Sequence, residues 1–280
     1  MKKNIRKKII YFQVFFLLCL FFWGRNLDTE VHLDFIFAPF SKSYWFGSDD
    51  LGRDVFSLLL VGGFRTMEVV LIAGSLSFGV GVFLGMLSGY LENTWSLVIK
   101  SLVDLLMIIP TFICALIITS IFGINPFTAG LSLGAFGIGN YMNHAEALTK
   151  REKKKEYVEA ALLLGVPAYR ILYRNILGNI ISELKVNLGN TASGVILQYA
   201  SLTFIGLGAD FSKPDWGMML YQYRLYLVSH PLLVLLPSLC IAWISLLLQF
   251  FMGYSKRKRG KMEVLMKIKN ISVSVGKRKF

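Results

Sequence analysis

Residues that could carry chemistry are few in this sequence and lie in three places. Asp49, Arg53 and Asp54 stand close together in a stretch rich in glycine and aromatic residues. Asp104 lies within a long apolar run. Glu156–Gly165, which reads EYVEAALLLG, belongs to a charged loop between two apolar runs. The chemistry open to such groups is charge pairing, helix capping, or contact with a charged ligand or a partner protein.

Motifs for nucleotide binding and for metal-dependent hydrolysis are missing from the sequence. It contains no Gly-x-x-x-x-Gly-Lys-Ser/Thr phosphate loop and no His-Glu-x-x-His. The three histidines and three cysteines are widely scattered, which argues against a metal cluster or a disulfide framework. We therefore predict no catalytic residues, no metal site and no cofactor, which disfavours an intramembrane hydrolase.

Long apolar helices must position the charged residues. Apolar side chains make up 55% of the 280 residues and charged ones 17%, whereas soluble domains carry roughly a quarter charged residues. A helix needs about 20 mostly apolar residues to cross a hydrocarbon core. We predict an all-α, polytopic membrane protein with six transmembrane helices, at about Ile9–Gly24, Met67–Tyr90, Leu102–Gly123, Thr128–Tyr141, Val186–Leu207 and Leu232–Phe251.

The net charge of +13 is concentrated in three basic clusters. They precede the first apolar run, follow the fourth and follow the sixth, so an even number of spans separates them. Positive residues collect on the cytoplasmic side of a membrane. Both termini and the loop around Tyr157 are therefore predicted to be cytoplasmic, while the acidic loops lie outside. This distribution indicates a lipid bilayer as the surroundings and no nucleic acid as a partner.

The chain divides into one transmembrane domain at 1–254 and a basic cytoplasmic tail at 255–280. Within the domain, Gly81, Gly85 and Gly89 recur at four-residue spacing, which favours close helix packing over a pore lining. In the tail, Leu265–Val275 alternates apolar and polar residues and suggests a short strand.

The predicted cytoplasmic loop, 144–185, has the pattern of two helices joined by a turn. Lys153–Leu164 contains good helix formers, and Gly165 follows where a C-terminal cap is expected. Pro167 suits the first turn of a second helix. Helices this short are unstable alone in water, so the pair must pack on the membrane domain, on a partner, or on both. One face of the second helix would carry Tyr169, Leu172, Tyr173 and Ile176.

Glu156–Gly165 resembles the EAA loop of bacterial ABC-importer permeases, a helix that docks into a groove on the ATPase subunit. Further stretches resemble the second, C-type permease of the peptide and nickel importers. These matches lie in the expected order over about Phe46–Pro237. They are Phe46–Val55, Gly89-Tyr90 with Asp104 and Pro110, Ser201–Gly208 and Asp215–Met219.

The resemblance implies a type I ABC-importer permease subunit of the bacterial cytoplasmic membrane, which forms half of a path for peptides, nickel or metal chelates. Peptides lead as the substrate, with nickel close behind. The implied partners are a second homologous permease, two ABC ATPase subunits and an extracytoplasmic substrate-binding protein. The ATPases would hydrolyse ATP, so this chain is expected to be no enzyme. The implied coupling residues are Glu156, Tyr157, Glu159, Ala160, Ala161 and Gly165.

Four acids and bases outside that loop are candidates for a gate or the translocation path. For Asp49, Arg53 and Asp54 we favour bracing of the outer gate or helix capping over ligand binding. Asp104 costs on the order of 3 kcal/mol inside a membrane, so it should face protein or a water-filled cavity. We favour a structural partner for it. The alternative function, an ion-coupled secondary transporter, needs acids or histidines at mid-membrane, and Asp104 alone qualifies.

The sequence also departs from the family pattern. Leu177-Gly178 replaces a Leu-Pro pair; glycine can still break the second loop helix, so this departure does not exclude docking. Ser96 and Ser101 occupy positions where an acid and an arginine are common. A basic ending, Tyr254–Gly260, replaces an acidic one, and Met266–Val275 resembles the opening strand of an ABC ATPase.

Overall fold

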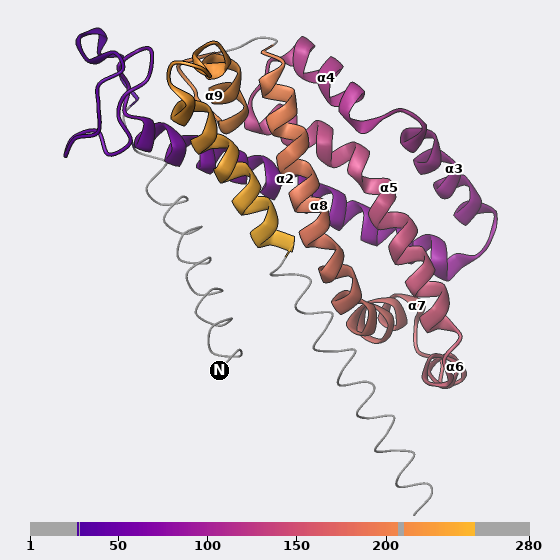
Figure 1. Cartoon of the computed structure of the whole chain (residues 1–280). Coiled ribbons are helices and arrows are strands. Elements are labelled where there is room, and N and C mark those ends of the chain that lie inside the picture. The colour runs from indigo at the N-terminus through magenta and orange to yellow at the C-terminus, as the bar shows by residue number, and fades with distance from the viewer. Residues whose placement is uncertain (1–26, 28, 207–209, 250–280) are drawn as a thin grey trace, which may run out of the picture.

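The structure is a computed structural model that describes residues 27, 29–206 and 210–249. Over these ranges the chain is a helical bundle without β-strands, which confirms the predicted all-α class (Figure 1). The predicted span Ile9–Gly24 and the basic tail lie outside them. The elements are η1 (Leu33–Phe35), α2 (Val55–Leu91), α3 (Thr94–Ile108), α4 (Thr111–Phe122), α5 (Pro126–Lys153), α6 (Glu156–Leu163), α7 (Ala168–Arg170), the π-helical η2 (Ile171–Leu177), α8 (Gly178–Phe204), α9 (Trp216–Tyr223), η3 (Arg224–Tyr226) and a last helix, Pro231–Gln249.

Two of the described helices, α2 and Pro231–Gln249, are each long and apolar enough to cross a membrane. α3 and α4 make a third span if the bent pair is counted as one. The span predicted at Leu102–Gly123 is not one continuous helix, because α3 and α4 meet within it at 76°. Pro110 lies at this break, where it lacks an N–H and holds the preceding Ile109 in an extended conformation. The count of six spans stays a prediction.

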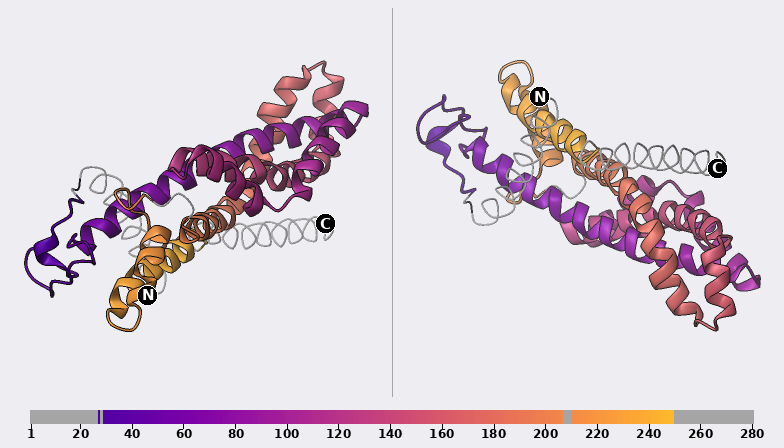
Figure 2. Two further views of the ribbon diagram at one scale, coloured as in Figure 1. Left: turned by 90° about the horizontal axis from the view of Figure 1, so that it is seen from above. Right: turned by 90° about the horizontal axis from the view of Figure 1, so that it is seen from below.

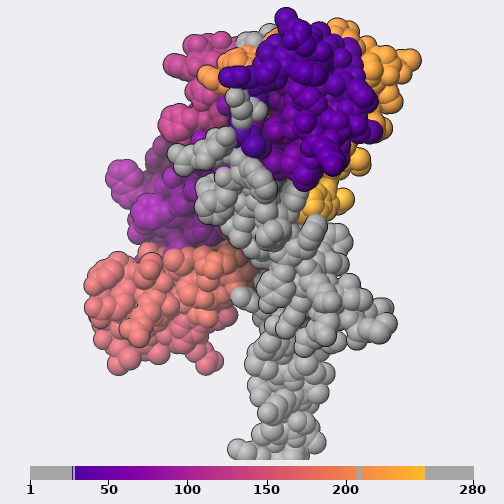
Figure 3. Space-filling view, turned by 90° about the vertical axis from the view of Figure 1, so that its left-hand side faces the viewer, coloured from indigo at the N-terminus to yellow at the C-terminus, as the bar shows by residue number. Residues whose placement is uncertain are grey.

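The helices run between two ends of an elongated bundle (Figures 1 and 2). The loop end carries residues 29–54, the connection between α4 and α5, and α9. The α6 end carries α6 and α7. α2, α5, α8 and the last helix run between the ends, and the spans predicted at 128–141 and 186–207 fall in α5 and α8. Figure 3 shows the two ends as separate surfaces, with the loop before α2 at one and the α6–α7 segment at the other.

The described apolar core consists of three clusters along the bundle. One lies at the loop end, around Leu58, Trp216 and Ile244. The second holds α2, α4, α5 and α8 together around Ala73 and Leu133. The third lies at the α6 end and includes the η2 residue Ile176. Buried side chains therefore connect both ends of the bundle to α2 and α8.

Glycines of α2 allow its backbone to touch that of α5. A Cβ atom added at Gly85 would lie 2.3 Å from the Met142 carbonyl oxygen and 2.8 Å from the Ala145 Cβ. At Gly81 an added Cβ would lie 2.6 Å from the Ile138 carbonyl oxygen. Any side chain here would push the two helices apart. The close packing predicted from the four-residue spacing is confirmed.

A methyl group at Gly85 should therefore separate α2 from α5. We expect Gly85→Ala to destabilise the protein by about 1–3 kcal/mol, because the obstructing atoms belong to the α5 backbone and cannot rotate away. The measurement is the thermal unfolding midpoint of the purified protein in mild detergent. Gly74→Ala is the matched control, since no atom lies within 4 Å of its added Cβ. Equal midpoints for the two variants would contradict the expectation.

Candidate functional site

A buried ion pair within the loop before α2 forms hydrogen bonds with α9. Asp49 and Arg53 are 0% and 1% exposed, and Arg53 Nη2 lies 2.7 Å from Asp49 Oδ2. Arg53 Nε donates to the same oxygen at 2.9 Å, and the Arg53 backbone N–H donates to Asp49 Oδ1 at 2.8 Å. From α9, the Tyr223 hydroxyl donates to Asp49 Oδ2 at 2.9 Å. The carboxylate is thus held on both sides, as a buried charge requires.

The rest of the Arg53 guanidinium binds the other side of the loop end. Its Nη1 donates to the Phe211 carbonyl oxygen at 2.5 Å, and its Nη2 donates to Gln222 Oε1 at 2.9 Å. Gln222 in turn donates to Asp50 Oδ1 at 2.5 Å. We call Asp49, Arg53, Gln222 and Tyr223 the loop-end clamp. The clamp ties segments distant in the sequence, so sequence patterns around Asp49 alone could not identify Gln222 or Tyr223.

The acids beside the clamp have different roles. Asp54 accepts hydrogen bonds from the Ser57 N–H at 2.9 Å and the Ser57 hydroxyl at 2.7 Å, so it caps the start of α2 as predicted. Burial raises the pKa of the Asp50 carboxyl, and the neighbouring Asp49 charge raises it further, against the lowering effect of the hydrogen bond from Gln222. Asp54 thus acts on the backbone, while Asp50 extends the clamp.

α6 is a short helix with a strongly specified C-terminus. Gly165 has φ +72°, its N–H donates to the Leu162 carbonyl at 3.0 Å, and the Val166 N–H donates to the Ala161 carbonyl at 3.0 Å. This pair of bonds is the Schellman motif, in which glycine takes the left-handed position at no steric cost. The predicted cap at Gly165 is confirmed. The predicted place of Pro167 is shifted by one residue, because it precedes the first residue of α7.

A polar cluster fastens α6 to two long helices. The Tyr157 hydroxyl donates to Glu152 Oε2 of α5 at 2.8 Å and accepts from Asn179 Nδ2 of α8 at 3.1 Å. Lys155 Nζ lies 2.6 Å from the second oxygen, Glu152 Oε1. Glu152 is buried, so its charge depends on these partners. Glu152 and Asn179 were not predicted, since they lie outside the EAA-like segment and meet Tyr157 only in the fold.

The remaining predicted coupling residues divide between surface and core. Glu156, Glu159 and Ala160 are exposed, whereas Ala161 is buried in the core cluster of the α6 end. Ala161 therefore packs within its own chain. The exposed surface of this segment also includes large apolar side chains, namely Leu163 (84% exposed), Leu164 (82%), Tyr169 (68%) and Tyr173 (76%).

Two predictions about the second loop helix are wrong. Tyr169 and Tyr173 are exposed while Ile176 is fully buried, so these residues do not share one face. Gly178 does not break the helix, since its φ of −53° and ψ of −35° are helical and η2 continues directly into α8. Glycine keeps its backbone N–H and places no ring against the preceding turn, and so it permits the continuation that proline would disrupt.

Asp104 lies on a face of α3 that no other described helix covers. Its neighbours Leu102 and Leu105 are 61% and 62% exposed, which makes this face otherwise apolar. Nearby, Ser96 donates to the Ser88 carbonyl at 2.8 Å and so links α3 to α2 without the charged residue that is common there.

A further motif in the sequence, Gly130–Gly134, has the form Gly-x-Ser-x-Gly of many serine hydrolases. The structure excludes that role for it. Ser132 is buried inside α5, and its hydroxyl donates to the Ala129 carbonyl at 3.0 Å. A hydrolase nucleophile sits instead on a sharp turn from strand to helix.

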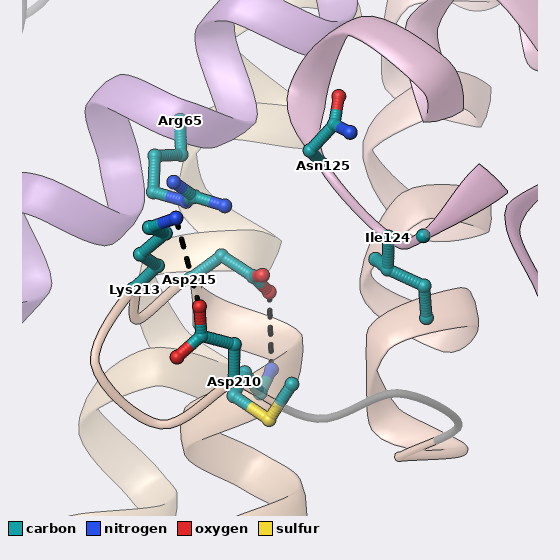
Figure 4. A pocket seen from close by; sticks show the side chains of 8 residues that line it. Arg65, Ile124, Asn125, Asp210, Lys213 and Asp215 are labelled. Atoms are coloured by element: carbon teal, nitrogen blue, oxygen red, sulfur yellow. Dashed lines mark hydrogen bonds and ion pairs between the residues drawn. The ribbon is translucent and has the colours of Figure 1, made fainter.

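A cavity of about 360 Å³ opens at the loop end, between α2, the α4–α5 connection and the segment before α9 (Figure 4). Arg65 and Asn125 lie on opposite sides of it, and the loop with Asp210 and Lys213 forms a third side. Lys213 Nζ lies 3.7 Å from Asp210 Oδ2. The described cavity thus combines basic, acidic and amide groups at the end opposite α6.

These features define a class of protein: a membrane-embedded helical subunit with a rigidly capped, exposed helix at one end. Residues 81–261 match the family of binding-protein-dependent transport system inner membrane components, and the chain belongs to this family. It is a permease subunit of an ABC importer, embedded in the inner membrane. As part of a binding-protein-dependent system, it works with ATPase and substrate-binding partners.

Three known proteins illustrate the similarity. The chain is 30% identical to the glutathione transport system permease protein GsiD of Pectobacterium atrosepticum over 233 residues, which cover 81% of this chain and 77% of GsiD. It is 31% identical over 210 residues to the dipeptide transport system permease protein DppC of Haemophilus influenzae, covering 75% and 70%. An inward-facing structure of the MetNI methionine ABC transporter shares the fold, with a TM-score of 0.53 at 18% identity over 72% of this chain and 96% of that chain.

The loop-end clamp should contribute strongly to stability. We expect Asp49→Asn to destabilise the protein by about 3–5 kcal/mol, because it leaves the buried Arg53 charge uncompensated. The thermal unfolding midpoint in detergent measures the effect, with the exposed Asp34→Asn as control. The double variant Asp49→Asn/Arg53→Gln should lose less than the sum of the single losses. Additive losses would show that the two side chains do not depend on each other.

The Tyr157 hydroxyl should fasten α6 across the physiological pH range. Burial, followed by the hydrogen bond to Glu152, raises the pKa of Tyr157 from 10.0 to about 12. Because the folded chain holds this proton more tightly, the stabilisation is complete below pH 10.0 and is lost as the pH rises through about 12. We expect Tyr157→Phe to lower stability by about 1 kcal/mol, by a constant amount from pH 7 to pH 9, in thermal unfolding. Tyr169→Phe, which alters an exposed tyrosine, should leave the midpoint unchanged.

Proposed function

We propose that this permease imports short peptides, together with a second homologous permease, two ABC ATPase subunits and an extracytoplasmic binding protein. The observation that supports the substrate class is the similarity to permeases named for glutathione and for dipeptides, both of which are small peptides. The similarity covers most of the chain and both ends of the bundle. Nickel and metal chelates are the competing substrates to be tested.

The proposed ATPase contact is the exposed surface of α6 and the residues that follow it. Glu156, Glu159 and Ala160 line this surface beside the exposed Leu163 and Leu164. Exposed leucines on a helix too short to be stable alone indicate a surface completed by a partner. The Gly165 cap keeps the helix rigid, so that movement of a bound ATPase would displace the helix as a unit.

The Tyr157 cluster supplies the mechanical link from that surface to the bundle. Glu152 belongs to α5 and Asn179 to α8, and both hold the Tyr157 hydroxyl. A force on α6 would therefore reach two long helices at once. We assign Glu152, Tyr157 and Asn179 as positioning residues for coupling, because they hold the contact surface without belonging to it.

The charge distribution supports an orientation. Lys150, Arg151, Lys153, Lys154 and Lys155 lie at the α6 end, which we therefore place in the cytoplasm along with both termini. The loop end then faces the extracytoplasmic binding protein. In this orientation Asp49 and Arg53 brace the outer side of the permease, and Asp54 fixes the start of α2.

Asp104 is proposed to face the second permease or the path between the two. An ionisable residue on a lipid-facing surface would be costly, and Asp104 has an otherwise apolar, exposed face around it. The contact should therefore be with protein or with water enclosed by the paired permeases. We place Asp104 at that junction and not within the core of this chain.

Transport and co-purification together test the proposed function. In the host strain, we expect loss of the permease to abolish uptake of a radiolabelled dipeptide and leave uptake of radioactive nickel unchanged. Purification of the tagged wild-type chain in mild detergent should recover the second permease and both ATPases, identified by mass spectrometry. Nickel uptake lost with peptide uptake retained would overturn the substrate assignment.

Glu159→Lys should separate assembly with the ATPases from membrane insertion. We expect the variant to reach the membrane at normal levels but to lose the ATPases on purification, because it inverts a charge on the exposed face of α6. Asp34→Lys makes the same inversion on an exposed residue at the loop end and should retain them. Quantitative mass spectrometry measures the ATPase-to-permease ratio. Full retention of the ATPases by Glu159→Lys would contradict the docking surface.

A further inference from the structure

We propose that the cavity at the loop end binds the free C-terminal carboxylate of a short peptide, with Arg65 as its main contact. The proposal rests on the peptide-import function above and adds a ligand site within the permease itself. The wall is built from α2, the α4–α5 connection, the segment before α9 and the start of α9 (Figure 4). Its lining residues are Arg65, Gly123, Ile124, Asn125, Asp210, Lys213, Asp215 and Met218.

Arg65 keeps one hydrogen-bond donor that the described part of its chain does not use, although its guanidinium also interacts with the Tyr199 hydroxyl and with the carboxyls of Asp210 and Asp215. Its Nε atom is buried and has no hydrogen-bond partner in the described part of the chain. None of the ion pairs among those residues, taken at 4.0 Å or less, includes Arg65. A buried donor without a partner is costly, and an anionic ligand would remove that cost. The guanidinium fork also matches the two oxygens of a carboxylate.

The acids around the cavity are already occupied by protein donors. Asp215 accepts from the Met218 N–H at 3.0 Å and from the Tyr199 hydroxyl at 3.2 Å. Asp210 accepts from the Ser212 N–H at 3.0 Å and from the Ser212 hydroxyl at 2.5 Å. Their lone pairs are therefore largely directed to the chain. Lys213 is held less firmly, since its side chain is 66% exposed and its Nζ lies a long 3.7 Å from Asp210 Oδ2.

The other walls suit the remainder of a small peptide. Asn125 uses its Oδ1 atom to accept from the Phe127 and Thr128 N–H groups, both at 3.0 Å, so that its amide NH₂ is the group left to donate. Ile124 and Met218 add apolar surface for a side chain. A cavity of about 360 Å³ accommodates a ligand of dipeptide size and excludes a folded partner. The volume, the donors and the apolar walls together favour a peptide terminus over a bare inorganic anion.

The test compares a dipeptide that has a free carboxylate with the same dipeptide amidated at its C-terminus. Uptake is measured in proteoliposomes that contain the complete importer and its binding protein, for the wild type, Arg65→Gln and Arg65→Lys. The binding protein is the same in every experiment, so its own preference for the acid or the amide cancels when the ratios of the variants are compared. We expect the acid-to-amide ratio of kcat/KM to fall about tenfold in Arg65→Gln, since one charge-assisted contact is removed, and to fall less in Arg65→Lys.

A second variant keeps the test decisive should Arg65→Gln fail to assemble. Lys213→Gln removes the other cation of the cavity from an exposed position and should lower the same ratio by a smaller factor. Lys42→Gln, at an exposed lysine of the loop end outside the cavity, should not change it. An unchanged ratio in Arg65→Gln, or in Lys213→Gln where the first variant is unstable, would overturn the carboxylate site while peptide import stands. Failure of the wild type to import either dipeptide would instead overturn the proposed function.

Discussion

Backbone contact between α2 and α5 holds the centre of the bundle together and positions the helices around it. At Gly85 of α2 the Met142 carbonyl of α5 lies so close that no side-chain carbon would fit between the two helices. In a membrane the apolar surroundings give little reason for helices to associate, so close packing and internal hydrogen bonds must supply it. This contact sets the position of α5, and α5 in turn carries Glu152 to the α6 end.

The two ends of the bundle are stabilised by different physical means. At the loop end, buried charges in the clamp join segments that the sequence separates widely, such as Arg53 and Gln222. At the α6 end, a backbone cap and one tyrosine hydroxyl hold a short helix whose leucines remain exposed. The buried ion pair of the clamp makes the loop end rigid, because separating Asp49 from Arg53 would leave a buried charge without a partner. An exposed, fastened helix is what the proposed docking of an ATPase would require.

The cavity and the clamp both lie at the loop end, but their arginines differ in how their N–H donors are bonded. Arg53 is surrounded by acceptors from its own chain, so its charge is satisfied. Arg65 lies along α2 with a buried donor that has no partner in the described chain. Arg53 thus has a structural role, whereas the role proposed for Arg65 is contact with a ligand. The Nε of Arg53 has a carboxylate acceptor from its own chain, whereas the Nε of Arg65 has no acceptor among the described residues.

The helical class, the EAA-like segment, the Gly165 cap, the Asp54 cap and the close packing at the α2 glycines could all be predicted from the sequence. These depend on local composition, on spacing along one helix, or on a backbone conformation that glycine takes without strain. The bend at Pro110, the burial of Ala161 and Ile176, and the continuation of the helix through Gly178 became visible only in the folded chain. The same holds for which residues meet Asp49, Tyr157 and the cavity around Arg65. Such contacts join positions far apart in the chain. The periodicity of one segment carries no information about which residue of another segment it will contact.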